Sequence, residues 1–306
     1  MQIRFSMKVL ISGATGLIGK EIIKLCHQNT IDVHYLTTSQ HKIKNKPNYR
    51  GYFWNPKQGE IDALCLLGVD AIIHLAGASI ASKWTPDYKE EIIESRVLSA
   101  NLLFNTLHKH ENQVKQFISS SGINIYPNSL EELYTEESQE IDDSFLGNVV
   151  LNWEEIADKF AIEHMKVAKI RTGVVLDALE GALPKLIQPI KLGLGAPLGS
   201  GKQWQSWIHI KDIAALYLFV LQNNLEGVYN AVSPNPVTNN EMTIEIAKRL
   251  KKPLWLPNIP AFILQVILGE MAILVLSGQK VSSKKIENKG FQFKYPTLVK
   301  ALENLI

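Results

Sequence analysis

KVLISGATGLIGKEI, residues 8–22, is the stretch from which the fold of this chain is predicted. An apolar run leads into Gly13, Gly16 and Gly19 at a G-x-x-G-x-x-G spacing, and a helical pattern begins among them. A glycine-rich turn between a strand and a helix is typical of a dinucleotide-binding βαβ unit. The first glycine permits the tight turn, the second lets the backbone approach a diphosphate, and the third permits close helix–strand contact. The diphosphate would lie at the helix N-terminus, which favours an anion.

Strand-like and helix-like patterns alternate through the first two thirds of the chain. Short apolar runs predict strands at 9–12, 33–37, 71–77, 116–121 and 167–176. A helix is predicted over 86–110, with a face toward the sheet made by Ile92, Ile93, Val97, Leu103 and Leu107. This alternation indicates an α/β fold, a Rossmann-type doubly wound parallel sheet with helices on both faces.

After residue 176 the sequence becomes rich in Gly, Pro and Trp. We therefore predict a smaller, partly interleaved C-terminal substrate domain. The dinucleotide-binding Rossmann domain would comprise 1–176 and 205–231, and the substrate-side domain would comprise 177–204 and 232–306.

Charge and composition exclude several classes of partner. The 306 residues carry 32 basic and 30 acidic side chains, a net charge of +2, which gives no reason to expect a nucleic acid or a membrane as partner. Cys26 and Cys65 lack a metal-ligand spacing, so no metal is expected. The N-terminus lacks the apolar core of a signal peptide, and the most apolar segment, 261–276, is too short to span a bilayer and is interpreted as a buried or interdomain helix. We expect a cytoplasmic protein; the sequence leaves open whether it is a monomer or a homodimer.

The second predicted strand ends in hydroxyl side chains where an acid would indicate NAD. A NAD-selective site holds the adenosine ribose with Asp or Glu at this place. Here Thr37, Thr38 and Ser39 occupy it, and Lys42 and Lys44 follow. These residues suit a 2′-phosphate, so NADP is predicted over NAD, although a solvated lysine-rich loop would have the same composition.

Further motifs extend along the whole chain. HLAGA at 74–78 and the serine strand FISSSGINIYP at 117–127 follow the glycine turn, and the second half contains RTGVVL, GLGAPLGSGKQWQSWIHIKD, NAVSPNPVTNNEM and GFQFKYPTL. The first two motifs, with the glycine turn, resemble the extended short-chain dehydrogenase/reductase superfamily. The later motifs are similar to its atypical "epimerase family" subgroup, NAD(P)-dependent epimerase/dehydratase-like proteins once described as cell-division-inhibitor-like.

This resemblance implies a set of site residues. Ser121 takes the place of the catalytic Ser or Thr of the superfamily; the alternative is a hydroxyl that merely ends its strand. The segment 171–175 would pass the nicotinamide. The implied cofactor-binding residues are Gly13, Thr15, Gly16, Leu17, Ile18, Gly19, Thr38, Ser39, Leu75, Ala76, Gly77 and Val174.

The same resemblance reveals a missing acid–base pair. The superfamily uses a Tyr-x-x-x-Lys pair, in which lysine lowers the tyrosine pKa so that the phenol exchanges a proton while hydride moves. Aligning FLGNVVLNWEE (145–155) on Glu154 places Leu146 and Val150 at these positions, on one apolar helix face. Neither Tyr126 nor Tyr134 has a lysine four residues later.

Four titratable side chains could replace the pair: Tyr126, Glu136, Glu154 and His209. Three of them have a structural alternative, since Glu136 could cap a turn, His209 could be a buried imidazole and Glu154 could pair with a basic neighbour.

Two functions therefore remain open. One is an NADP-dependent oxidoreductase or sugar-nucleotide-type epimerase with an unconventional proton donor and a small polar, sugar-like substrate. The other is a non-catalytic protein that binds NADPH, senses its redox state and signals through the C-terminal domain.

Overall fold

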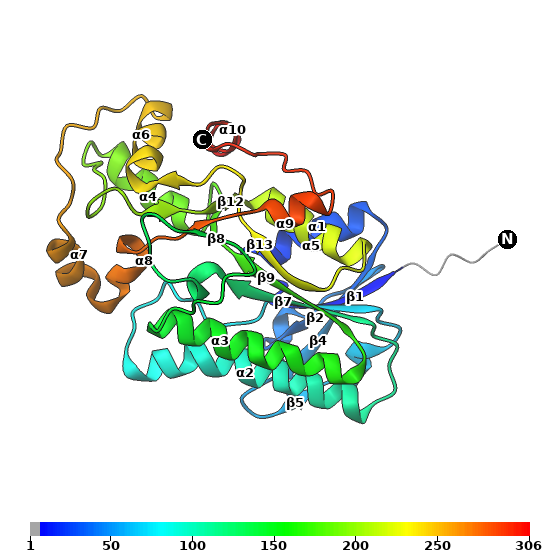
Figure 1. Cartoon of the computed structure of the whole chain (residues 1–306). Helices are drawn as coiled ribbons and strands as arrows, with labels where there is room; N and C mark the ends of the chain where they lie inside the picture. The colour runs from blue at the N-terminus through cyan, green and yellow to red at the C-terminus, as the bar shows by residue number, and fades with distance from the viewer. Residues whose placement is uncertain (1–6) are drawn as a thin grey trace.

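The computed structural model describes residues 7–306 and has a central nine-stranded sheet covered by helices on both faces (Figure 1). The strand order is β13-β9-β7-β6-β1-β2-β4-β3, and β5 pairs with β4. Only the pairs that β3 and β5 form with β4 are antiparallel. The predicted α/β, doubly wound fold is confirmed. The strands are β1 (Lys8–Ser12), β2 (Asp32–Thr37), β3 (Asn45–Lys46), β4 (Tyr49–Asn55), β5 (Glu60–Ile61), β6 (Ala71–His74), β7 (Gln116–Gly122), β9 (Lys166–Thr172) and β13 (Gly227–Ala231).

The strand order reverses between β1 and β6, and this is where a ligand can enter. Val9, Leu10 and Ile11 of β1 are completely buried, as expected for a central parallel strand covered on both faces. The chain leaves β1 and β6 toward opposite sides of the sheet, so a crevice remains outside their carboxyl ends. The glycine turn follows β1 and the HLAGA motif follows β6 at this edge.

Four long helices cover the sheet. α1 (Leu17–Gln28) and α5 (Ile210–Gln222) pack together on one face, and α2 (Pro86–Lys109) and α3 (Phe145–Asp158) on the other (Figure 1). α2 begins where capping predicts, because the Thr85 side chain accepts the backbone N–H of Tyr88.

The buried face of α2 differs from the predicted one in two positions. Ile92, Leu103 and Leu107 are buried as expected, but Ile93 and Val97 are only partly buried. The polar residues Arg96 and Ser99 lie on the buried face instead.

The predicted single strand 167–176 is wrong: it is two strands that belong to different sheets. β9 ends at Thr172, and β10 (Val174–Leu176) pairs with β12 (Trp207–His209). Gly173 makes the change of direction possible, since a Cβ there would lie 2.2 Å from the Ser206 carbonyl oxygen. The apolar pattern also missed β4 and β13, which lie toward the two edges of the sheet and contain polar residues.

The C-terminal part packs around its own apolar cluster, which includes Leu183, Trp207, Met242 and Leu302. Its helices are α4 (Ala182–Lys191), α6 (Asn239–Arg249) and α10 (Leu298–Leu305), which lie together in Figure 1. Two further pairs of short strands lie outside the central sheet. β8 (Leu133–Tyr134) pairs with β15 (Lys280–Val281), and β11 (Trp204–Gln205) pairs with β14 (Val237–Thr238). The segment around α9 (Lys284–Asn288) returns to the sheet, because Ile286 packs in the same cluster as β1 and α5. The division into two domains stays a prediction.

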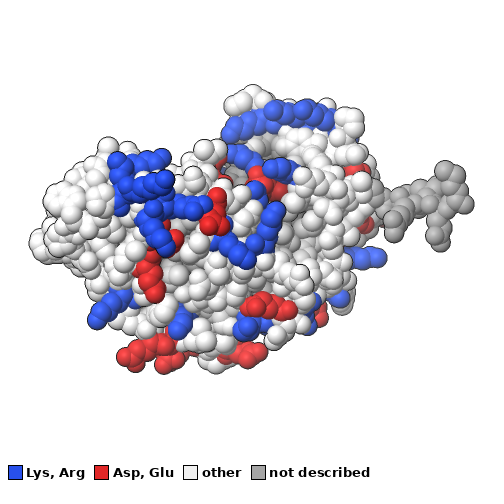
Figure 2. Space-filling view, turned by 90° about the horizontal axis from the view of Figure 1, so that it is seen from above, with Lys and Arg blue, Asp and Glu red and all other residues white. Residues whose placement is uncertain are grey.

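The segment 261–276 was predicted to be one buried or interdomain helix; it is not a single helix, and much of it is exposed, although its second half lines the larger cavity with α3. The segment forms α7 (Ala261–Leu268), a short 3-10 turn η5 (Gly269–Ala272) and α8 (Ile273–Leu276), with Gly269 at a positive φ of 58° between the first two. Val266 is 83% exposed and Phe262 65%. In Figure 2 this end of the molecule, at the left, shows no charged side chain.

No helix among residues 7–306 is long and apolar enough to cross a membrane. The prediction about the N-terminus concerns residues of which 1–6 lie outside the described part of the chain.

Gly19→Ala should destabilise the fold, because a Cβ there would lie 2.4 Å from the Gly13 carbonyl oxygen and 2.9 Å from the Ala14 Cα, both backbone atoms. We expect the free energy of unfolding to fall by about 1–3 kcal/mol in chemical denaturation. Lys24→Ala, on the exposed face of the same helix, should change it by less than about 0.5 kcal/mol. Equal stability of Gly19→Ala and wild type would contradict the close contact.

Candidate functional site

Two neighbouring cavities follow the carboxyl ends of the strands. The smaller, of about 420 Å³, is lined by residues that follow β1, β2 and β6. The larger, of about 730 Å³, is lined by residues that follow β7 and β9 and by parts of α3, α4 and 268–279. The two cavities are neighbours along the chain. Thr15 and Ala78 line the smaller cavity, and Leu17 and Ser79, which follow closely after them, line the larger. Together they form one elongated site across the switch point of the sheet.

Most of the residues implied for the cofactor lie at these cavities. The smaller is lined by Gly13, Thr15, Thr38, Ser39, Ala76 and Gly77, and the larger by Leu17, Val174 and Ser121. Gly16, Ile18, Gly19 and Leu75 line neither: they shape the turn and its packing. Of the two lysines after β2, Lys42 lines the smaller cavity and Lys44 does not.

The glycine turn leaves the start of α1 open. Gly13 has a positive φ of 69°, and its Cα approaches the chain at Leu75 so closely that a Cβ would lie 2.9 Å from that carbonyl. α1 begins directly after Gly16, and no side chain caps it. Its first N–H groups and the positive end of its dipole therefore have no side-chain acceptor among the described residues, next to Thr15 of the smaller cavity and Leu17 of the larger.

A buried histidine holds the loop after β6. Ser12 Oγ accepts the backbone N–H groups of Leu75 and Ala76 at 3.1 and 3.2 Å, so its own proton is donated to His74 Nδ1, 2.7 Å away. His74 Nε2 then carries the ring proton and faces Ser99 Oγ at 3.2 Å. Burial lowers the pKa of His74 to about 3, so the imidazole is neutral. This neutral chain of hydrogen bonds fixes the loop between the two cavities.

Arg96 is a buried cation without an acidic partner among the described residues. Its residue is 7% exposed, Nη1 donates to the carbonyl oxygens of Ile92 and Ala78, and Nε is buried without a partner in this part of the chain. Its Cζ lies 4.6 Å from the ring centre of Trp153, and a Cβ on Gly77 would lie 3.1 Å from it. Burial lowers its pKa to about 10, so the guanidinium stays charged at neutral pH. A buried charge of this kind indicates an anion brought by a ligand.

Sequence reasoning missed Arg96, together with Glu91 and Lys57 in the smaller cavity. The signal for Arg96 is a basic residue four positions after Ile92 and four before Ala100, within the apolar face of α2.

Ser121 is engaged in a buried ion-pair network. Its hydroxyl donates to Glu154 Oε1 at 2.6 Å, and Arg171 donates to both carboxylate oxygens of Glu154 at 2.7 and 2.9 Å. Arg171 also donates to the hydroxyl of Tyr126, which in turn donates to Asn230 Oδ1. Burial by itself would raise the pKa of Glu154, but Arg171 and the Ser121 hydroxyl outweigh it, so the pKa lies below its usual range. Ser121 lines the larger cavity, but its hydroxyl proton is donated to Glu154 and not toward the cavity.

The four substitute acid–base residues have structural partners, and none lines either cavity. Tyr126 and Glu154 belong to the network just described. Glu136 Oε1 accepts the backbone N–H of Asn230, and His209 accepts a backbone N–H at the start of α5. Burial raises the pKa of Tyr126, which opposes its ionisation.

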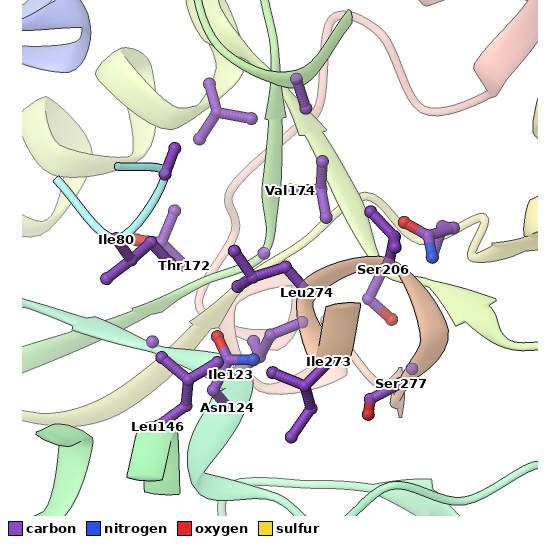
Figure 3. Close-up of a pocket in the computed structure, with 18 of the residues that line it drawn as sticks. Ile80, Ile123, Asn124, Leu146, Thr172, Val174, Ser206, Ile273, Leu274 and Ser277 are labelled. Atoms are coloured by element: carbon purple, nitrogen blue, oxygen red, sulfur yellow. The ribbon is translucent and has the colours of Figure 1, made fainter. Parts of the chain in front are cut away.

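Leu146 and Val150 line the larger cavity, where the sequence alignment predicted an apolar wall. Leu146, Ile123 and Asn124 lie on one side of the cavity in Figure 3, with Ile273 and Leu274 opposite. The positions of the usual tyrosine and lysine thus present hydrocarbon to the site.

Comparison with known proteins places the chain in a family. Residues 9–231 match the "NAD dependent epimerase/dehydratase family", and residues 259–305 match a domain of unknown function, DUF1731. The chain belongs to the NAD-dependent epimerase/dehydratase family. The resemblance noted in the sequence is confirmed.

Relatives of this epimerase/dehydratase family member match over nearly its whole length. An epimerase family protein of Staphylococcus aureus is 33% identical over 304 residues, 97% of this chain and 98% of the relative. The human epimerase family protein SDR39U1, crystallised with NADPH, is 30% identical with a TM-score of 0.85, covering 98% and 99% of the two chains. A nucleoside-diphosphate sugar epimerase of Corynebacterium glutamicum is 30% identical with a TM-score of 0.77, covering 97% of this chain and 57% of that one.

In this family member, Glu154→Gln should be strongly destabilising and should change the acid response. The Arg171 charge would stay buried without its counter-ion, so we expect a loss of about 3–5 kcal/mol at neutral pH in chemical denaturation. In wild type the folded-state pKa lies below the ordinary 4.5, so the unfolded chain binds more protons in acid and stability falls as the pH drops below about 4.5.

The variant should lose this part of the acid dependence. Asp158→Asn is the matched control, because Asp158 pairs with Lys169 and its side chain is 59% exposed. We expect the control to cost less than about 1 kcal/mol. Equal destabilisation by the two substitutions would show that the buried pair has no special role.

Proposed function

We propose that this protein binds NADP(H) along the two cavities and uses it as an oxidoreductase or epimerase without the usual Tyr–Lys pair. The observation that carries the proposal is the buried cation Arg96, which has no acidic partner among the described residues and lines the larger cavity together with Leu17, the first residue of α1. NADPH in the crystal structure of the human relative supports the choice of cofactor.

The residues present fit a dinucleotide in one orientation. The diphosphate would face the first N–H groups of α1 and the guanidinium of Arg96. The positive end of the helix dipole and the arginine charge would both stabilise its negative charge. The adenosine would occupy the smaller cavity, with Thr38, Ser39 and Lys42 available to a 2′-phosphate. The nicotinamide would enter the larger cavity beside Val174.

Bound NADPH supplies a hydride to an oxidised carbon of a substrate. The chain's own contribution is binding, orientation and exclusion of water by the apolar walls. Among residues 7–306, the charged side chains that line the larger cavity are Arg96 and Lys185, and no Tyr, His, Asp or Glu lines it. A proton required by the reaction would therefore come from a group outside the conventional set.

The same geometry favours a second candidate, a non-catalytic NADPH-binding regulator. All four substitute acid–base residues are hydrogen-bonded within the fold, and Leu146 and Val150 replace the usual pair. Under this proposal the redox state of the nicotinamide would be read by the segment 268–279 that lines the same cavity.

Lys42→Gln tests the cofactor. If Lys42 faces the 2′-phosphate, the substitution should weaken NADPH binding roughly tenfold in calorimetric titration and leave NADH binding unchanged. Lys44→Gln is the matched control, since Lys44 follows in the same segment but does not line the cavity, and both affinities should stay as in wild type. Wild-type protein that binds NADH as tightly as NADPH would contradict the preference for NADP.

A substrate panel tests catalysis. We expect clear NADPH binding but negligible turnover of simple alcohols, ketones and common nucleotide sugars, because no group at the usual positions can exchange a proton. NADPH absorbance follows oxidation and reduction, and product analysis detects redox-neutral epimerisation. Robust turnover of an ordinary nucleotide sugar would contradict the claim that the conventional machinery is absent.

A further inference from the structure

The wall of the larger cavity is mainly hydrocarbon. α3 contributes one side, and the segment from the end of α7 through α8 contributes the other (Figure 3). The apolar lining residues from these two segments are Leu146, Val149, Val150, Trp153, Leu268, Met271, Ile273, Leu274 and Val275. A surface of this kind stabilises an apolar ligand by removing its area from water.

Most polar side chains of this cavity form hydrogen bonds within the protein, whereas Asn124, Gln205 and Ser277 form none with a described residue. Ser206 Oγ donates to the carbonyl oxygen of Gln279, Asn239 Oδ1 accepts a backbone N–H, and Ser121 donates to Glu154. A sugar buries several hydroxyl groups, each of which needs a partner when it leaves water. This wall offers few.

The charge of the cavity has one sign. No Asp or Glu among residues 7–306 lines it, whereas Arg96 and Lys185 do. Lys185 is exposed on α4 and forms no ion pair with a described residue, so its ammonium is available at the mouth of the cavity. A cationic ligand would meet like charge and no counter-charge.

We propose that the larger cavity binds an amphiphile, with an apolar chain or ring body between α3 and 268–275 and an anionic head group, a carboxylate or a phosphate, toward Lys185. This inference rests on the proposed function, because the amphiphile would be the substrate beside the nicotinamide. It differs from the small polar substrate predicted from the sequence alone.

A chain-length series measures the contribution of the apolar wall. Hexanoate, octanoate and decanoate are titrated calorimetrically into the full-length protein below their micelle-forming concentrations. Each added pair of methylenes should raise the affinity by about tenfold, and by at least threefold. Uridine-diphosphate glucose should not displace decanoate. Affinity that is independent of chain length, or displacement by the nucleotide sugar, would overturn the proposal.

Two aspartate substitutions localise the binding. Leu274→Asp places a carboxylate inside the cavity, where Figure 3 shows the side chain pointing, and should weaken decanoate binding at least about tenfold. Val266→Asp makes the same change on the 83% exposed outer face of α7 and should leave it as in wild type. Circular dichroism establishes that both variants are folded. Equal affinities of the two folded variants for decanoate would show that the ligand binds elsewhere.

The head group is tested with ligands of one chain length. Decanoate and decyl phosphate should each bind more tightly than decyltrimethylammonium, and whichever is tighter identifies the head group. Lys185→Gln should reduce this preference about threefold or more while the affinity for decanol is kept. Tighter binding of the ammonium compound would overturn the anionic assignment.

NADPH titration of the same samples separates this inference from the proposed function. Decanoate binding without NADPH binding would remove the proposed function and leave the amphiphile site. NADPH binding without decanoate binding would remove the amphiphile and leave the cofactor.

Discussion

The buried ion pair between Glu154 and Arg171 is the interaction that holds in place the side of the larger cavity lined by Ser121. It joins α3 to β9, and the hydroxyls of Ser121 and Tyr126 complete its hydrogen bonds from β7 and the segment that follows. Two charges can be buried together only when their remaining hydrogen-bonding groups are satisfied. The network meets this condition by using side chains that could otherwise have carried out proton transfer. The contacts that stabilise this side of the cavity therefore also engage the side chains that could have transferred a proton there.

A second buried arginine shows the opposite arrangement. Arg96 has no acidic partner among the described residues, and its neighbour His74 is kept neutral by burial, so nothing in this part of the protein neutralises the guanidinium. Arg171 is paired with Glu154 within the fold, whereas the charge of Arg96 is the one that the proposed anionic cofactor would neutralise. The two arginines are buried to nearly the same degree and differ in whether the described part of the chain supplies a carboxylate.

Membership of a family fixes less about the reaction than the walls of the cavity do. The human relative shares the fold, and in this chain the larger cavity is lined by side chains from α3 and from 268–279. Most of those side chains are apolar, and α7, which leads into 268–279, has a further apolar face turned to solvent. The part of this wall that comes from 268–279 lies within residues 259–305, which match a domain of unknown function.

Local sequence determined the parts that depend on local rules. The run before Gly13 predicted a buried strand, the three glycines marked the turn, and the spacing of Leu146 and Val150 predicted one apolar helix face. That this face replaces an acid–base pair came from the resemblance to the superfamily. Tertiary structure decided the rest. Nothing in the serine strand indicates that Ser121 donates to Glu154, since the two are 33 residues apart and meet only when α3 packs on β7. Apolar periodicity placed Ile93 and Val97 toward the sheet, but the helix turns Arg96 and Ser99 inward, where His74 and the two cavities lie. The apolar segment 261–276 was expected to be one buried or interdomain helix, yet Gly269 interrupts it and only part of it lines the cavity. Hydrophobicity reports how much apolar surface a segment has; which neighbour covers that surface depends on contacts between residues far apart in the chain.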